Sequence, residues 1–227
     1  MGSTIKDSIP DSIFHSISRH LIKSAHRAED GYLSNEEEED SITGDLFRSL
    51  RKGWAQPATI NNEPWKWRLT TRKFRGKGEL ATESILGADG IIQVEIDGNQ
   101  GSVIRKGMLF QAKKGWKYRN QKLVDQVAKM EEFAPESSAM FDYRPDGYRA
   151  FVGRVVLQSH GRPDMTMQRR LGEFLADIFL GCLVGRTDTY YDWDKRTLIL
   201  AGHQPTYANI PVFLHPKYLA AIQIERK

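Results

Sequence analysis

The sequence predicts a single α/β domain with a central mixed β-sheet flanked by helices. The chain has 227 residues, which suits one well-buried core and would be tight for two full-sized domains. Its hydrophobic period changes from helical spacing near the N-terminus to two-residue alternation further along. Hairpin turn signals join some expected strands and a helical segment joins others, so both antiparallel and parallel neighbours are expected.

Two helices are expected before the first strand. Apolar residues recur at helical spacing from Ile13 to Ile22, which predicts a helix over residues 10–28. A loop is expected at residues 30–35 and a second helix over residues 35–52. The apolar stripe of this second helix is formed by Ile42, Leu46, Phe47 and Leu50.

Strands are expected where apolar residues alternate with polar ones or run continuously between turns. These segments are residues 65–74, 90–96, 102–112, 138–143, 148–157 and 198–201. Helices are expected over residues 120–133 and 164–184. Residues 1–227 should therefore form one domain, with a core at about residues 35–157, the N-terminal helix, and a helical C-terminal extension over residues 164–227.

The composition excludes several classes of protein and site. No apolar run approaches the roughly 20 residues of a membrane-spanning helix, and no apolar export signal starts the chain, so a cytoplasmic location without membrane contact is expected. Cys182 is the only cysteine, which fits a reducing compartment and excludes an internal disulfide or a cysteine-built zinc site. The six histidines lack zinc-like spacing, and neither a P-loop nor a serine nucleophile elbow is present.

Charged residues are concentrated in three stretches. Residues 36–40 read Glu-Glu-Glu-Glu-Asp, whereas residues 66–77 and 105–122 are rich in lysine and arginine. The formal net charge is +4. A basic chain with one acidic stretch can offer a metal site to a nucleic-acid phosphate. The alternative interpretation is that these charges only form solvated surfaces.

Asp89, Gln111 and Lys113 form the candidate catalytic set. Asp89 precedes an apolar strand, and Gln111 and Lys113 stand two residues apart at the end of the next one, so their side chains share one face. Metal-dependent phosphodiester cleavage needs hard oxygen ligands and a positive group beside the attacking water. Asp89 and Gln111 can supply the oxygens and Lys113 the ammonium group. The alternative is a polar strand edge with a solvent-facing lysine.

The acidic start of the second helix supplies the remaining candidate ligand. Steps of three and four residues backward along its apolar stripe end at Glu39, at the edge of the core-facing side. The alternatives are Asp40, or a capping role for the whole acidic stretch. Glu83 could assist the metal or lie on a hairpin surface. Gln126 could contact substrate or be a surface amide.

These residues resemble the PD-(D/E)xK, or restriction-endonuclease-like, nuclease superfamily. The matching pattern is a helix with Glu39, a strand with Asp89, and a strand ending in Gln111-Ala112-Lys113, followed by a helix and another strand. The resemblance implies a Mg²⁺-dependent endonuclease with a restriction-endonuclease-like core, in which Mn²⁺ can substitute. Glu39, Asp89 and Gln111 would hold the metal. Lys113 would orient the attacking water.

The chain departs from the family's motif at two positions. Gln111 stands where the motif has Asp or Glu, which is a known variation, and Ala88 stands where it has proline. Glutamine removes one negative charge, which should weaken metal affinity.

The resemblance also implies a biological setting. The segment Glu39-Asp40-Ser-Ile-Thr43-Gly44 resembles the first-helix motif of nucleases in bacterial anti-phage defence. We therefore expect a defence effector that cleaves double-stranded DNA, with a homodimer or a partner protein of the defence system choosing the target. Lys114, Lys117 and Arg119 follow the catalytic strand and are candidates for phosphate contacts.

Two other functions fit the same features. A nucleic-acid-binding or assembly module that keeps the fold without cutting would use the basic stretches equally well. Metal separates this rival from a nuclease, since a pure binder needs neither Glu39 nor Asp89. An RNA nuclease is the third hypothesis, because nothing in the sequence identifies a reader of the 2′-hydroxyl.

Overall fold

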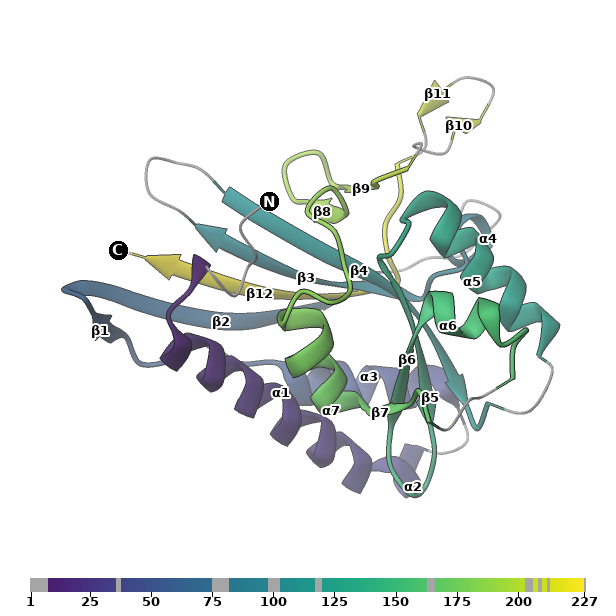
Figure 1. The fold of residues 1–227 in the computed structure, drawn as a ribbon, viewed down its shortest axis with the longest axis horizontal. Helices are drawn as coiled ribbons and strands as arrows, with labels where there is room; N and C mark the ends of the chain where they lie inside the picture. The colour runs from purple at the N-terminus through teal and green to yellow at the C-terminus, as the bar shows by residue number, and fades with distance from the viewer. Residues whose placement is uncertain are drawn as a thin grey trace.

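Eight strands in the described part of the chain form one mixed sheet in the computed structural model (Figure 1). The structure describes residues 8–35, 38–74, 82–97, 103–116, 120–162, 166–202, 206–207, 210–211 and 213–226. The strands of the sheet, in spatial order, are β1 (Ala58–Ile60), β2 (Glu63–Lys73), β12 (Tyr218–Arg226), β3 (Gly90–Asp97), β4 (Val103–Lys114), β5 (Ser138–Tyr143), β6 (Arg149–Val152) and β7 (Arg169–Arg170). β12 is parallel to β3 and β4 is parallel to β5, whereas the other neighbours are antiparallel.

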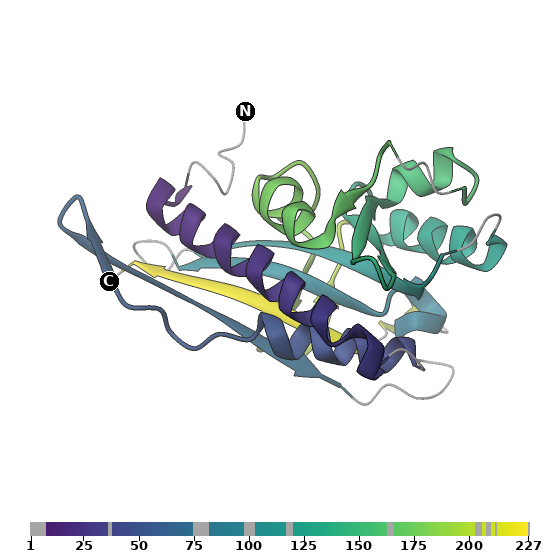
Figure 2. The same ribbon diagram turned by 90° about the horizontal axis from the view of Figure 1, so that it is seen from below.

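Helices cover both faces of this sheet. They are α1 (Asp11–Asp30), α2 (Tyr32–Asn35), α3 (Glu39–Leu50), α4 (Thr82–Leu86), α5 (Gln121–Phe133), α6 (Gly153–Gln158), α7 (Leu171–Glu173) and the π-helix η3 (Phe174–Leu180). α1 lies along one face next to α3 (Figure 2), and α5 packs with α4 and α6. Two small hairpins, β8 (Tyr190–Asp192) with β9 (Thr197–Ile199) and β10 (Thr206–Tyr207) with β11 (Ile210–Pro211), lie outside the main sheet. None of the described helices combines the length and apolar character that crossing a membrane requires.

Alternate residues of the central strands belong to two separate hydrophobic cores. In β3, Ile92 and Val94 pack in the core that contains α1 and α3, whereas Ile91 packs in the core that contains α5. In β12, Ile222 packs in the core that contains α1 and α3, and Leu219 packs in the core that contains α5. Because side chains alternate along a strand, one that is covered on both faces must be apolar on both. This is why these two strands lie in the interior of the sheet.

The predicted α/β class, with a mixed sheet flanked by helices, is confirmed. The helices expected at residues 10–28 and 120–133 are α1 and α5, and the strands expected at residues 65–74, 90–96, 102–112, 138–143 and 198–201 are β2, β3, β4, β5 and β9. The long segments among them have a strong local period, which identifies an element without knowledge of its partners.

Four predictions for other segments are wrong in type or extent. The loop expected at residues 30–35 contains α2, and the helix expected at residues 35–52 is limited to α3. The strand expected at residues 148–157 ends at Val152 and continues as α6. Of the helix expected at residues 164–184, the described residues form only α7 and η3 as helical segments, and β7 precedes them. Short apolar runs fit a strand and a helix equally well by periodicity, and pairing or packing then decides.

The C-terminal part of the chain is not the helical extension that the sequence predicts over residues 164–227. β12 comes from this region and lies between β2 and β3, with Ile222 opposite Leu69 on one side and Val94 on the other. The core therefore extends beyond the predicted residues 35–157. β12 is not among the predicted strands, and its place between β2 and β3 depends on hydrogen bonds to segments that are distant in sequence.

We expect Leu219→Ala in β12 to lower the free energy of unfolding by about 2–5 kcal/mol, because it leaves a cavity in a packed core. Leu219 is 1% exposed. Leu33→Ala is the matched control: it removes the same atoms from a side chain that is 74% exposed, and should change the stability by less than about 0.5 kcal/mol. Urea unfolding followed by circular dichroism measures both. Equally small effects would contradict the placement of β12.

Candidate functional site

Asp89 is held before β3 by backbone hydrogen bonds to both neighbouring strands. Its N–H donates to the carbonyl of Phe110 at 2.9 Å, and its carbonyl accepts from the N–H of Tyr218 at 3.1 Å. Gly87 allows the preceding turn, because its φ is +72° and a side chain there would collide with the backbone of Gln126. Asp89 is thereby placed between β4 and β12, where only 6% of it is exposed.

Gln111 on β4 contacts the Asp89 carboxylate directly. Its Nε2 donates to Asp89 Oδ2 at 2.8 Å, and the N–H of Ala112 donates to the same oxygen at 2.8 Å. Gln111 is fully buried, and its Oε1 has no hydrogen-bond partner among the described residues. A buried amide oxygen without a partner carries a desolvation cost. This atom is therefore able to accept a further hydrogen bond or to coordinate a cation.

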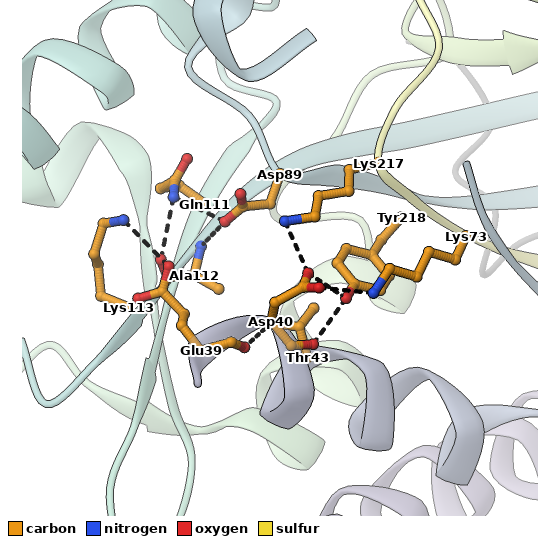
Figure 3. A network of polar contacts seen from close by, with 10 residues as sticks. All are labelled: Glu39, Asp40, Thr43, Lys73, Asp89, Gln111, Ala112, Lys113, Lys217 and Tyr218. Atoms are coloured by element: carbon orange, nitrogen blue, oxygen red, sulfur yellow. Dashed lines mark hydrogen bonds and ion pairs between the residues drawn. The ribbon is translucent and has the colours of Figure 1, made fainter. Parts of the chain in front are cut away.

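Glu39 and Lys113 form an ion pair beside these two residues (Figure 3). Lys113 Nζ donates to Glu39 Oε1 at 3.3 Å, and the N–H of Lys114 donates to Glu39 Oε2 at 3.0 Å. These contacts dock the first turn of α3 on the end of β4. The structure thus places Asp89 against Gln111, and Glu39 against Lys113, in one region of the molecule.

The environment of Asp89 raises the pKa of its carboxyl group strongly. Burial raises the pKa of Asp89 to about 7. The N–H of Ala112 and the charge of Lys113 lower it, whereas Glu83 and Glu39 add repulsion that raises it. At neutral pH a substantial fraction of this carboxyl group therefore holds a proton in the metal-free protein. A bound cation would displace that proton, because it favours the ionised form.

Asp40, the alternative to Glu39, belongs to a separate network. Its Oδ1 accepts from the Tyr218 hydroxyl at 2.6 Å and pairs with Lys217 at 2.8 Å, and its Oδ2 pairs with Lys73 at 2.7 Å. Burial alone would raise the pKa of Asp40, but hydrogen bonds from Lys217, Lys73 and Tyr218 hold it well below its usual range. The Asp40 carboxylate is therefore engaged with cations, and Glu39 is the acid of this helix beside the candidate site.

Lys217 is a residue of this region that the sequence did not identify. Its ammonium group interacts with the charges of Asp40, Asp89 and Glu83. Burial lowers the pKa of Lys217, but the hydrogen bond and attraction of Asp40, with the other two acids, raise it above its ordinary value. Lys217 directly precedes β12, so the insertion of β12 beside β3 is what brings it here. An isolated lysine carries no sequence signal for that position.

The remaining candidates lie around these residues. Gln126 on α5 is buried and its Nε2 donates to Glu83 Oε1 at 3.4 Å, so the interpretation of Gln126 as a surface amide is wrong. Glu83 lies on α4 rather than on a hairpin. Lys114 ends β4 and is exposed. Lys117 and Arg119 lie outside the described residues.

The oxygen atoms at this site are of the chemical type that binds a small divalent cation. Asp89 and Glu39 offer carboxylate oxygens, and Gln111 offers the amide oxygen without a partner. These are the hard ligands that Mg²⁺ and Mn²⁺ prefer. In the described ranges no three or more His, Cys, Asp or Glu side chains are grouped to hold a metal. A cation here would therefore rely on the amide oxygen and on solvent in addition to the two carboxylates.

Comparisons of the chain with protein-family models, with curated proteins and with solved structures found no match. Its function is therefore inferred from the chemistry of these residues.

The raised pKa of Asp89 predicts a pH-dependent stability in the metal-free protein. The folded state keeps this proton up to about pH 7, whereas the unfolded chain loses it near the ordinary value of 3.8. The folded state binds more protons in this window, so its stability falls as pH rises through it. Relative to Asp89→Asn, the wild-type free energy of unfolding should fall by roughly 2–4 kcal/mol from pH 4 to pH 7. Urea unfolding in EDTA tests this, and a pH-independent difference between the two proteins would contradict it.

Proposed function

We propose that this chain is a metal-dependent nuclease of the PD-(D/E)xK type that hydrolyses DNA phosphodiester bonds. The observation that carries the proposal is the buried, unpartnered Oε1 of Gln111 beside the Asp89 carboxylate. The Glu39–Lys113 ion pair stands next to it. An oxygen-lined cation site with an adjacent ammonium group is what metal-assisted phosphodiester hydrolysis requires.

The order of elements supports the same class. α3 carries Glu39, Asp89 directly precedes β3, and β4 ends after Gln111-Ala112-Lys113. α5 then leads to β5, which is parallel to β4. This is the sequence of helix, hairpin and helical crossover that a restriction-endonuclease-like core requires.

In this proposal Asp89, Glu39 and Gln111 hold Mg²⁺ or Mn²⁺. The bound cation would lower the pKa of an attacking water and offset the charge of the scissile phosphate. The Lys113 ammonium group, paired with Glu39, orients that water. It also stabilises the negative charge that develops as the water oxygen bonds to phosphorus and the P–O bond to the leaving group breaks. Lys217 places a second positive charge near Asp89, where it attracts the substrate phosphate.

The biological setting in this proposal rests on the resemblance alone. It is the cytoplasm of a bacterium, where the nuclease would act on double-stranded DNA as an effector of anti-phage defence. A homodimer or a partner protein of the defence system would choose the target. Lys114, Lys117 and Arg119 would contribute phosphate contacts beside the metal.

Wild-type protein should cleave linear and supercoiled double-stranded DNA with Mg²⁺ or Mn²⁺ and should not cleave it in EDTA. Lys113→Ala and Asp89→Ala should each lower the cleavage rate by at least about 100-fold, the order expected for loss of one preorganised charge. Lys23→Ala is the matched control, because Lys23 is an exposed lysine on α1, and it should cleave at the wild-type rate. Circular dichroism checks that each variant is folded.

Three results would each contradict a part of this proposal. Cleavage that survives both substitutions would exclude the proposed site. DNA binding that is insensitive to EDTA, with no cleavage under either metal, would identify the non-cleaving module instead. Cleavage of RNA in preference to DNA would contradict the proposed substrate while leaving the metal site in place.

Gln111→Glu should strengthen metal binding and weaken the metal-free fold. An added negative charge attracts the cation, and a gain in affinity of roughly tenfold or more is expected. In EDTA the variant lacks the Nε2–Oδ2 hydrogen bond and sets a second carboxylate beside Asp89, so the free energy of unfolding should fall by about 1–3 kcal/mol. Calorimetric titration with Mn²⁺ and urea unfolding measure the two effects.

The control for this variant is Gln121→Glu, which adds the same charge at an exposed position on α5. It should leave Mn²⁺ affinity near the wild-type value. Equal changes in affinity for the two variants would show that Gln111 is not a ligand and that only net charge matters.

A further inference from the structure

Two adjoining clefts lie along β2, the first between β2 and α3 next to Asp40, and the second between β2, Gln223 of β12 and Trp193. One has a volume of about 430 Å³ and the other about 390 Å³. They share Arg51, Thr71 and Arg72, so together they form one continuous surface along β2. We call it the arginine groove, and its basic lining residues are Arg48, Arg51, Arg68, Arg72 and Lys73.

The charge of the arginine groove is strongly positive. Among the described residues that line the two clefts, the only acid is Asp40, and its carboxylate is already paired with Lys73 and Lys217. Arg51 and Arg72 are exposed, and no carboxylate of the described residues forms an ion pair with either one. Such a surface is complementary to a polyanion.

Arginines contact two tryptophan rings, Trp193 in the arginine groove and Trp54 beside it. The guanidinium group of Arg68 lies 4.5 Å from the ring centre of Trp54, and that of Arg72 lies 5.6 Å from the ring centre of Trp193. Arg68 also donates to the Gln223 side chain at 2.7 Å. Stacking and hydrogen bonding of this kind hold a cation in place, and they occupy ring faces on which bases could otherwise stack. The groove therefore offers positioned guanidinium groups, which bind phosphates, rather than free ring faces, which bind bases.

The arginine groove leads to the candidate metal site. Asp40, which lines it, follows Glu39 directly in α3. Figure 3 shows Asp40 between Lys73 and Lys217, with Lys217 next to Asp89. A polyanion in the groove would therefore pass along the turn of α3 that carries Glu39.

We propose that the arginine groove binds the sugar–phosphate backbone of duplex DNA, without base recognition, and leads one strand to the metal site. The choice of DNA and the direction toward the metal rest on the function proposed above. Duplex DNA is favoured over a single strand because arginines already contact both Trp54 and Trp193, whereas single-strand binding uses exposed aromatic rings.

Binding of a labelled DNA duplex in EDTA tests this proposal, because cleavage does not occur without metal. Fluorescence anisotropy over a range of salt concentrations gives the affinity and its salt dependence. The double variant Arg51→Ala/Arg72→Ala should bind roughly tenfold more weakly or worse at about 0.1 M salt. The slope of log affinity against log salt should become less steep by about 1.8, or about 0.9 for each lost phosphate contact. Duplexes of unrelated sequence should be affected equally.

Two control variants separate a specific groove from a general effect of charge. Arg154→Ala/Arg169→Ala removes the same charge from exposed positions on α6 and β7, and β7 is the edge strand opposite β1. It should keep the wild-type slope. Arg51→Lys/Arg72→Lys keeps both charges and should also keep that slope. Thermal unfolding verifies that all three double variants are folded.

The outcomes are decisive for the groove and for the nuclease separately. The groove would be refuted if the salt-dependence slope decreased equally in Arg51→Ala/Arg72→Ala and in Arg154→Ala/Arg169→Ala. It would also be refuted if the slope of Arg51→Ala/Arg72→Ala stayed at the wild-type value. Tighter wild-type binding to single-stranded DNA or to duplex RNA than to duplex DNA would overturn the assignment of its ligand. Slope changes as expected, in a protein that never cuts DNA, would support the groove and refute the nuclease. DNA cleavage by the wild-type protein, together with unchanged DNA binding by Arg51→Ala/Arg72→Ala, would support the nuclease and refute the groove.

Discussion

The burial of the Asp89 carboxylate is the constraint on which the rest of the site depends. A carboxylate that is almost entirely excluded from water needs hydrogen bonds or a cation to offset its lost hydration. One of its oxygens receives two N–H donors, from Gln111 and Ala112, and burial still raises its pKa to about 7. The orientation of Gln111 that serves Asp89 leaves Oε1 without a partner. In the proposed function, a bound cation would interact with both of these side chains.

β12 supplies the second half of that environment. The N–H of Tyr218 binds the carbonyl of Asp89, while its hydroxyl binds Asp40 on α3. Lys217, just before β12, pairs with Asp40 and acts electrostatically on Asp89. β12 therefore connects Asp40 on α3 with Asp89 before β3. The same strand gives β2 an antiparallel neighbour, so it also supports one wall of the arginine groove.

Two consecutive acids at the start of α3 have separate environments. Glu39 contacts Lys113 and the backbone of β4, whereas Asp40 contacts Lys73 and Lys217. Lys113, Lys73 and Lys217 balance the negative charges of these two acids, which both stand in the first turn of one helix. The proposed metal site and the arginine groove meet at this turn. Cutting and backbone binding would then be coupled through a single rigid element rather than through a loop.

The sequence by itself determined the elements with a strong local period, the α/β class, and the shared face of Gln111 and Lys113, because a repeating pattern reports which side chains are buried without reference to distant partners. It also nominated Glu39 and Asp89 as candidate ligands. Tertiary structure alone decided the position of β12, and with it the place of Lys217, since the pairing of this strand depends on segments that are distant in sequence. Tertiary structure also decided that Oε1 of Gln111 lacks a hydrogen-bond partner among the described residues, and that the arginine groove forms. Both features depend on how the whole chain packs.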